Sequence, residues 1–151
     1  MPNRKVHAAV GVMSSVGVAA VTLNGQELSP WQAGLELIAA GVAGHITSAL
    51  PDRIDRPMSP SHRAAAHSMT AGVAVGVYAL SHVPSFQTIC RTKAREFERM
   101  RMTSQDLVQT AILFLAEAGL YVASGIAVGA PVGYASHLAL DMTTPSGLPL
   151  A

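Results

Sequence analysis

The sequence predicts an all-α protein: a compact, strongly apolar bundle of about five to six helices that is associated with a membrane. Half of its 151 residues are hydrophobic and only 13% are charged, whereas soluble globular proteins carry roughly 25% charged residues. The long apolar stretches are punctuated by prolines and capping residues. A chain of this length fits one domain, so residues 1–151 are treated as a single helical domain.

The first apolar stretches predict two helices. Residues 6–26 contain no Asp, Glu, Lys or Arg and approach the length of one bilayer crossing, about 20 residues. Ser29 and Gln32 flank a proline in the pattern of an N-cap, a first-turn proline and a capping box. We therefore expect a second helix over residues 30–50, ended by Pro51.

Prolines mark the later boundaries. Residues 52–61 combine proline with Asp and Arg, a composition typical of an ordered loop. A third helix is expected to begin near Ser59 or Ser61 and to run to about His82, with Pro84 ending it. A further helix is expected over residues 107–128, and Pro131 is expected to separate it from a last short helix.

Between these helices, residues 86–101 have the pattern of a basic amphipathic helix. Its apolar positions recur near every 3.6 residues and are Phe86, Ile89, Cys90, Ala94, Phe97 and Met100. Its basic residues, expected on the remaining face, are Arg91, Lys93, Arg95, Arg99 and Arg101. Such a helix suits an anionic headgroup layer, but it equally suits the solvated surface of a soluble bundle.

Charge and cysteine content exclude several classes of function. The formal net charge is +1 and no basic run is interleaved with aromatic residues, so nucleic-acid binding is not expected. Cys90 is the only cysteine, which leaves nitrogen and oxygen as the ligands for any metal. The basic start and following apolar run resemble a signal peptide superficially. We reject that interpretation because His7 belongs to the ligand set described next.

Histidine and aspartate gather in three short motifs. The motifs are LPDRID with Asp52 and Asp55, SHRAAAHS with His62 and His67, and SHLALD with His137 and Asp141. Carboxylates and neutral imidazoles are the oxygen and nitrogen donors that a zinc-like ion accepts, and a catalytic ion keeps one position open for water. The last two residues stand four apart, so on a helix they face the same side.

Alternating helix directions bring these motifs to one end of the bundle. The residues placed there are His7, Asp52, Asp55, His62, His67, His137 and Asp141. Individually, each has a simpler explanation, because a lone histidine is usually a satisfied polar residue and an aspartate often caps a turn. Asp141 is harder to explain this way, since a carboxylate among leucines needs a partner. His45 and His82 fall outside the pattern and are taken as structural.

Together the motifs resemble the YdjM-like family of inner-membrane-associated, metal-dependent hydrolases. The matching pieces are His7, Leu50 to Asp52 with Asp55 and Pro57, His62, Arg63, His67 and Ser68, then Gly133, Ser136, His137, Asp141, Thr143, Thr144 and Gly147. Arg56 departs from the family, which often has a histidine there, so a second metal is in doubt. The resemblance implies an all-helical hydrolase of a bacterial-type inner membrane, integral or peripheral, with membrane lipids as partners.

These observations define the expected site. The expected metal ligands are His7, Asp52, His67, His137 and Asp141. The residues assigned to catalysis are Asp55 and His62, as general base or orienting group, and Arg63, as a phosphate-binding group. Zinc is the first choice of divalent ion, with manganese or magnesium as alternatives and with one or two ions. A looser similarity to zinc-dependent phospholipase C and the single-strand nuclease fold favours a phosphoester substrate.

Other functions remain open at this stage. The same ligands could form a closed structural metal site in a membrane or interaction protein that has no activity. Buried histidine and aspartate also line ion pathways in transporters. Five basic residues fall near each end of the bundle, so the positive-inside rule gives no orientation. A homo-oligomer is compatible with the sequence.

Overall fold

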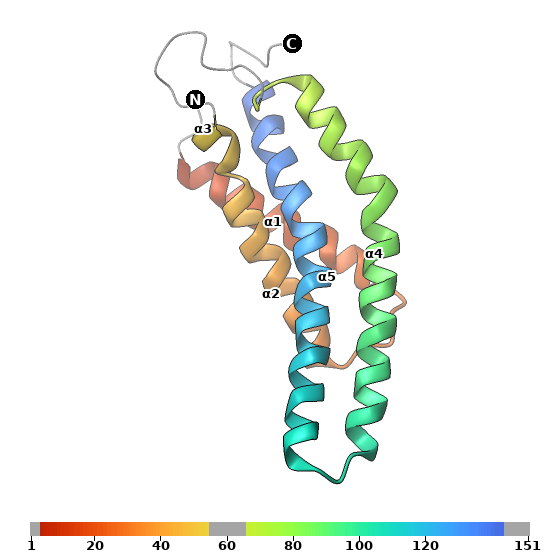
Figure 1. The fold of residues 1–151 in the computed structure, drawn as a ribbon. Helices are drawn as coiled ribbons and strands as arrows, with labels where there is room; N and C mark the ends of the chain where they lie inside the picture. Colours follow the sequence, from red (N-terminus) through yellow and green to blue (C-terminus); the bar gives the residue numbers. More distant parts are fainter. Residues whose placement is uncertain (1–3, 55–65, 144–151) are drawn as a thin grey trace.

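The computed structural model describes residues 4–54 and 66–143, and they form helices only. Figure 1 shows four long helices and one short one. They are α1 (Arg4–Leu23), α2 (Pro30–Thr47), α3 (Leu50–Ile54), α4 (Met69–Thr103) and α5 (Leu107–Met142). The all-α prediction is confirmed, but the structure has four long helices where five to six helices were expected, because two of the expected breaks lie inside α4 and α5.

Both breaks were predicted from prolines. Pro84 lies inside α4 and Pro131 lies inside α5, so neither ends a helix. Proline removes one backbone hydrogen bond, which usually ends a helix in water. In an apolar bundle the freed carbonyl finds other partners, and breaking the helix would expose more backbone groups. The basic amphipathic segment is consequently the second half of α4 rather than a separate helix.

The starts of the helices are closer to expectation. The Ser29 amide donates to Gln32 Oε1 over 2.8 Å at the start of α2. Helix α2 ends at Thr47, before the expected limit, and Pro51 lies within the short α3, where a first-turn proline is tolerated. Helix α4 starts at Met69, later than expected, because Ser68 is its N-cap: the Ser68 hydroxyl accepts a hydrogen bond from a backbone amide.

Helix α5 is the centre of the bundle, and it packs against α1, α2 and α4 (Figure 1). Helices α2 and α5 run in the same direction, while α1 and α4 run the other way. The starts of α1 and α4 therefore lie at the same end as the ends of α2 and α5. Four segments are long and apolar enough to cross a membrane, namely Arg4–Leu23, Pro30–Ile54, Met69–Thr103 and Leu107–Met142.

Glycines on α5 bring its backbone into contact with α2. A Cβ atom added at Gly129 would lie 2.6 Å from Ala40 Cα, and one added at Gly133 would lie 2.5 Å from Gly44 Cα. At Gly125 an added Cβ would meet the backbone of Glu36. The glycines are spaced by four residues, and so are their partners on α2. Small residues at this spacing are how helices approach closely inside a membrane.

A buried ion pair joins α4 to α2. The Arg91 guanidinium donates to both Glu36 carboxylate oxygens, over 2.9 Å and 2.6 Å, and both side chains are buried. Arg91 was expected on the basic face, opposite the apolar residues of the segment, so its burial corrects the prediction. On the expected apolar face, Cys90 and Ala94 are buried, whereas Phe86 and Ile89 are 44% and 59% exposed. In a membrane the surroundings are apolar, so exposed Phe86 and Ile89 suit contact with lipid, and the Arg91 charge turns inward to a carboxylate partner.

A second buried acid is paired in a similar way. Glu117 accepts hydrogen bonds from Gln32 Nε2 over 2.9 Å and from Arg101 Nε over 3.0 Å. Both carboxylates that interrupt the apolar stretches, Glu36 and Glu117, therefore have charged partners supplied by α4. These pairs fix the second half of α4 against α2 and α5.

The glycine contacts predict an asymmetric effect of adding one methyl group to α5. Gly129→Ala should destabilise the protein by about 1–3 kcal/mol, because the new Cβ collides with the α2 backbone. Gly119→Ala is the matched control on the same helix, since nothing lies within 4 Å of its added Cβ. Unfolding in mixed detergent followed by circular dichroism measures both. Equal stabilities would contradict the close packing.

The Glu36–Arg91 pair gives a second prediction. Arg91→Met should cost about 3–5 kcal/mol, because it leaves the Glu36 carboxylate buried without its cation. The double variant Glu36→Leu with Arg91→Met should recover most of that loss, since no charge then remains buried. Lys93→Met, at an exposed position of α4, should have little effect. The same unfolding experiment applies, and a double variant no better than Arg91→Met would rule out this explanation.

Candidate functional site

Five ionisable side chains meet at the end of the bundle where α1 and α4 begin and α5 ends. His7 lies on α1 and Asp52 on α3, and His67 directly precedes Ser68, the N-cap of α4. The other two, His137 and Asp141, lie near the end of α5. All are buried except Asp52, whose side chain is 37% exposed. We call this set the His/Asp cluster.

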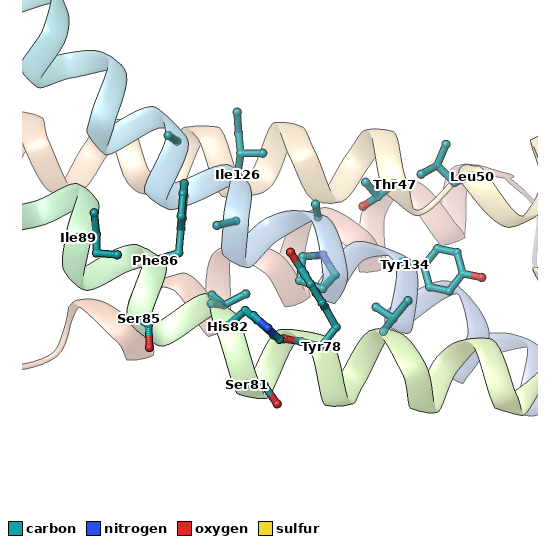
Figure 2. A pocket seen from close by; sticks show the side chains of 16 residues that line it. Thr47, Leu50, Tyr78, Ser81, His82, Ser85, Phe86, Ile89, Ile126 and Tyr134 are labelled. Carbon is teal, nitrogen blue, oxygen red and sulfur yellow. The ribbon is translucent and has the colours of Figure 1, made fainter.

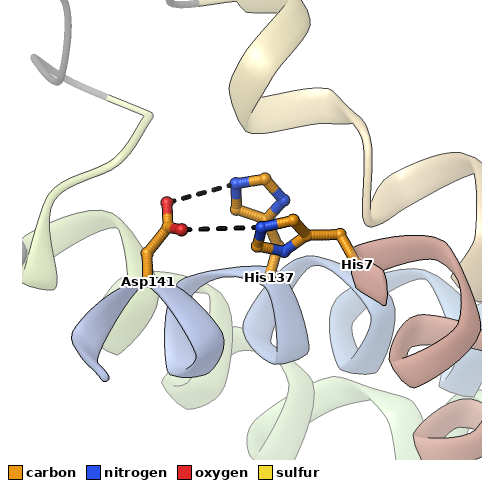
Figure 3. Close-up of side chains that lie close together, drawn as sticks. All are labelled: His7, His137 and Asp141. Carbon is orange, nitrogen blue, oxygen red and sulfur yellow. Dashed lines mark ion pairs between the residues drawn. The ribbon is translucent and has the colours of Figure 1, made fainter. Parts of the chain in front are cut away.

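Local structure explains why each side chain points to the same place. His137 and Asp141 are one turn apart on α5, and Figure 3 shows both reaching toward the His7 ring from α1. His67 is held by its neighbours, because the Tyr134 hydroxyl donates to the carbonyl of Ala66 over 2.5 Å. The short helix α3 brings Asp52 over His67 and His137.

The register of α2 and α5 places His137. The glycine contacts pair residues four apart on each helix, and the next step of that series pairs Ser48 with His137. At this step His137 Nδ1 lies 2.6 Å from the Ser48 carbonyl oxygen. A carbonyl can only accept, so Nδ1 carries the proton and Nε2 keeps its lone pair. His137 Nε2 is therefore available as an acceptor or a metal ligand.

Three further donor atoms lie within 3.7 Å of His137 Nε2, and we call these four atoms the four-donor set. This nitrogen lies 3.3 Å from His67 Nε2, 3.4 Å from Asp141 Oδ2 and 3.7 Å from Asp52 Oδ1. His67 Nε2 lies 3.3 Å from the same Asp52 oxygen and 3.8 Å from the same Asp141 oxygen. A tetrahedral ion with bonds of about 2.1 Å holds its ligand atoms about 3.4 Å apart. The donors thus fit a small divalent cation in both chemistry and spacing.

His7 occupies the other side of the cluster. Its ring stacks on that of His137, with centroids 4.0 Å apart, and its Nε2 lies 3.6 Å from Asp141 Oδ1. His7 Nδ1 is buried and has no hydrogen-bond partner among the described residues. His7, His137 and Asp141 form a second group with metal-like spacing, which shares two residues with the four-donor set.

Other residues from the sequence analysis fall elsewhere. Asp55, His62 and Arg63 lie outside the described residues, as does Arg56. His45 is exposed on α2. His82 lies on α4, where its Nδ1 is 3.0 Å from the Tyr78 carbonyl. Neither of these two histidines joins the His/Asp cluster.

Sequence reasoning missed the Ser48 carbonyl and Tyr134. Backbone carbonyls leave no trace in a sequence, but the spacing of Gly125, Gly129 and Gly133 is a visible signal. It continues by four residues to His137, and it could have indicated that this histidine faces α2. Tyr134 could not have been found this way, because its partner Ala66 is distant in sequence.

Comparisons with known proteins give one family and no individual relative. Searches of curated proteins and of solved structures found no significant match. A family model described as the YdjM inner membrane protein matches residues 1–151. The match agrees with the four apolar segments long enough to span a membrane. The chain therefore belongs to the YdjM inner membrane protein family, and it is a membrane protein.

Proposed function

We propose that this protein is a metal-dependent hydrolase of the membrane, acting on a phosphoester or a related bond. The observation that carries the proposal is the four-donor set, in which two imidazole nitrogens and two carboxylate oxygens lie 3.3–3.8 Å apart in the measured pairs. These imidazole and carboxylate donors are of the type that a divalent transition-metal ion accepts.

The proposed ligands are His67 Nε2, His137 Nε2, Asp52 Oδ1 and Asp141 Oδ2. Two imidazoles favour zinc over magnesium, which prefers oxygen donors and bound water, and manganese is the alternative. His137 offers one free lone pair, since Nδ1 donates to Ser48, so it can serve one ion only. The proposal is therefore a single ion, with His7 holding the second oxygen of Asp141.

The residues around the ion have separate roles in the proposed hydrolysis. A divalent ion at this place lowers the pKa of coordinated water toward neutrality. Asp52, the exposed member of the cluster, marks the side from which a substrate reaches it. Water oxygen bonds to phosphorus, the bond from phosphorus to the leaving oxygen breaks, and the leaving oxygen takes up a proton. Asp55 or His62 is proposed to move that proton, and Arg63 to bind the phosphate.

Metal content is the first test. Purified wild-type protein should contain about one equivalent of zinc or manganese by elemental analysis, and His137→Ala and Asp141→Ala should lose most of it. His45→Ala is the matched control, because that histidine is exposed and outside the cluster. Full metal content in both cluster variants would defeat the ligand assignment.

Hydrolysis is the second test. Wild-type protein should cleave at least one generic phosphodiester, phosphomonoester or carboxylic ester, and chelation should abolish that activity until metal is restored. Asp141→Asn should lower turnover by roughly 10² or more, because the amide keeps the size but not the charge of the ligand. His45→Ala should retain wild-type turnover. Activity that survives complete chelation would exclude the metal-dependent mechanism.

A structural metal site is the second candidate, because four protein donors at tetrahedral spacing can close the coordination shell. The two functions differ in what chelation does. A structural ion contributes folding free energy, so its removal should unfold the cluster end and lower the melting temperature strongly. A catalytic ion should be removable with the helical content unchanged. X-ray absorption at the metal edge counts the ligands directly, and a bound water favours the hydrolase.

A further inference from the structure

A large apolar groove opens on the side of the bundle, next to the His/Asp cluster. It has a volume of about 920 Å³ and lies between α4 on one side and α2 and α5 on the other (Figure 2). We call it the lateral groove, and the lining residues used below are Leu50, Tyr78, Phe86, Ile89, Ala127 and Tyr134. Its size matches cavities that bind small molecules, which measure roughly 300–1,000 Å³.

One end of the lateral groove adjoins the His/Asp cluster. Tyr134 is one helical turn before His137 on α5, and its hydroxyl holds the carbonyl of Ala66, next to His67. On the opposite wall, Leu50 lies two residues before Asp52. Residues on two different helices, α3 and α5, therefore line the groove close to the cluster.

The length of the lateral groove matches one leaflet of a bilayer. Its wall on α5 extends from Ala123 to Tyr134, a helical rise of about 16 Å. The hydrocarbon core of a bilayer is about 30 Å thick, so one leaflet contributes about 15 Å. The lateral groove is therefore about as long as one leaflet is thick.

The lining and the opening of the groove indicate what enters it. Among the described residues, the lining contains no Asp, Glu, Lys or Arg, and its one histidine is His82, so a charged or strongly polar molecule gains little there. Tyr78 and Ile89 are 63% and 59% exposed, which means that the groove opens sideways. Because α4 is long and apolar enough to cross a membrane, an opening on its exposed side suits contact with lipid hydrocarbon.

We propose that the lateral groove holds one acyl chain of a phospholipid from the surrounding leaflet, with its phosphate at the His/Asp cluster. The inference rests on the proposed function and names its substrate class. Holding the chain in the groove keeps the headgroup phosphoester beside the proposed metal ligands. The groove would thus favour hydrolysis by positioning the substrate and would take no part in the chemical step. Water adds across one phosphorus–oxygen ester bond of the headgroup phosphodiester, and the products are an alcohol and a phosphate monoester.

Photolabelling tests the position of the chain without requiring activity. Wild-type protein in phosphatidylethanolamine and phosphatidylglycerol vesicles is irradiated with a phospholipid that carries a diazirine either at the acyl terminus or near the carboxyl carbon. The terminal probe should label peptides at Phe86 and Ile89, and the proximal probe those at Leu50 and Tyr134. The same labelled peptides with both probes would overturn the proposed chain placement.

A matched pair of variants separates groove binding from general lipid contact. Ala127→Trp fills the lateral groove, whereas Ala111→Trp adds the same bulk at an exposed position of α5. Labelling of groove peptides should fall about tenfold in Ala127→Trp and stay unchanged in Ala111→Trp, with equal helical content by circular dichroism. Undiminished labelling in Ala127→Trp would overturn the inference. If Ala127→Trp loses helical content, the comparison of the two diazirine probes on wild-type protein decides whether the groove holds the chain.

Hydrolysis separates failure of the inference from failure of the proposed function. Ala127→Trp should lower kcat/KM for a long-chain phospholipid about tenfold while leaving a short soluble phosphodiester unaffected. Asp141→Asn should abolish both activities. Position-specific labelling without any hydrolysis would reject the hydrolase and keep a lipid-binding groove. Hydrolysis of both substrates unaffected by Ala127→Trp would reject the groove and keep the hydrolase.

Discussion

The close approach of α5 to α2 is the constraint on which the rest of the molecule depends. Three glycines at four-residue spacing let the two backbones touch, and the next residue of that series is His137, against the Ser48 carbonyl. The packing of the helices therefore sets the rotation of the imidazole and its tautomer. The position of this imidazole is therefore set by backbone contact, which is stiffer than contact between long side chains.

The bilayer reverses the usual distribution of side chains around this contact. Large apolar residues such as Phe86 and Ile89 face outward, while the buried Glu36 and Glu117 are paired with Arg91 and Arg101. Burial of apolar area cannot drive helix association where the surroundings are hydrocarbon. Close packing of small residues and pairing of charges hold the helices together instead. The glycine contacts lie between α2 and α5, and the ion pairs lie along the second half of α4.

The sequence was sufficient for the fold class and for the end of the bundle where the ionisable residues gather. That prediction needed only helix order and direction, which the apolar stretches and caps define. It failed at Pro84 and Pro131, because proline is a reliable stop only where water can satisfy the freed backbone groups. It failed at Arg91 because an amphipathic pattern does not say which face is inside. The tautomer of His137 depends on the Ser48 backbone carbonyl, so no sequence pattern could have predicted it.

The order of the cluster residues along the chain has a consequence for biosynthesis. His7 belongs to the first helix and Asp141 to the end of the last, so the cluster is incomplete until α5 has inserted. Before that moment His7, Asp52 and His67 lack the partners that α5 supplies. A nascent chain therefore brings these side chains together only once α5 has inserted, so the cluster forms late rather than helix by helix.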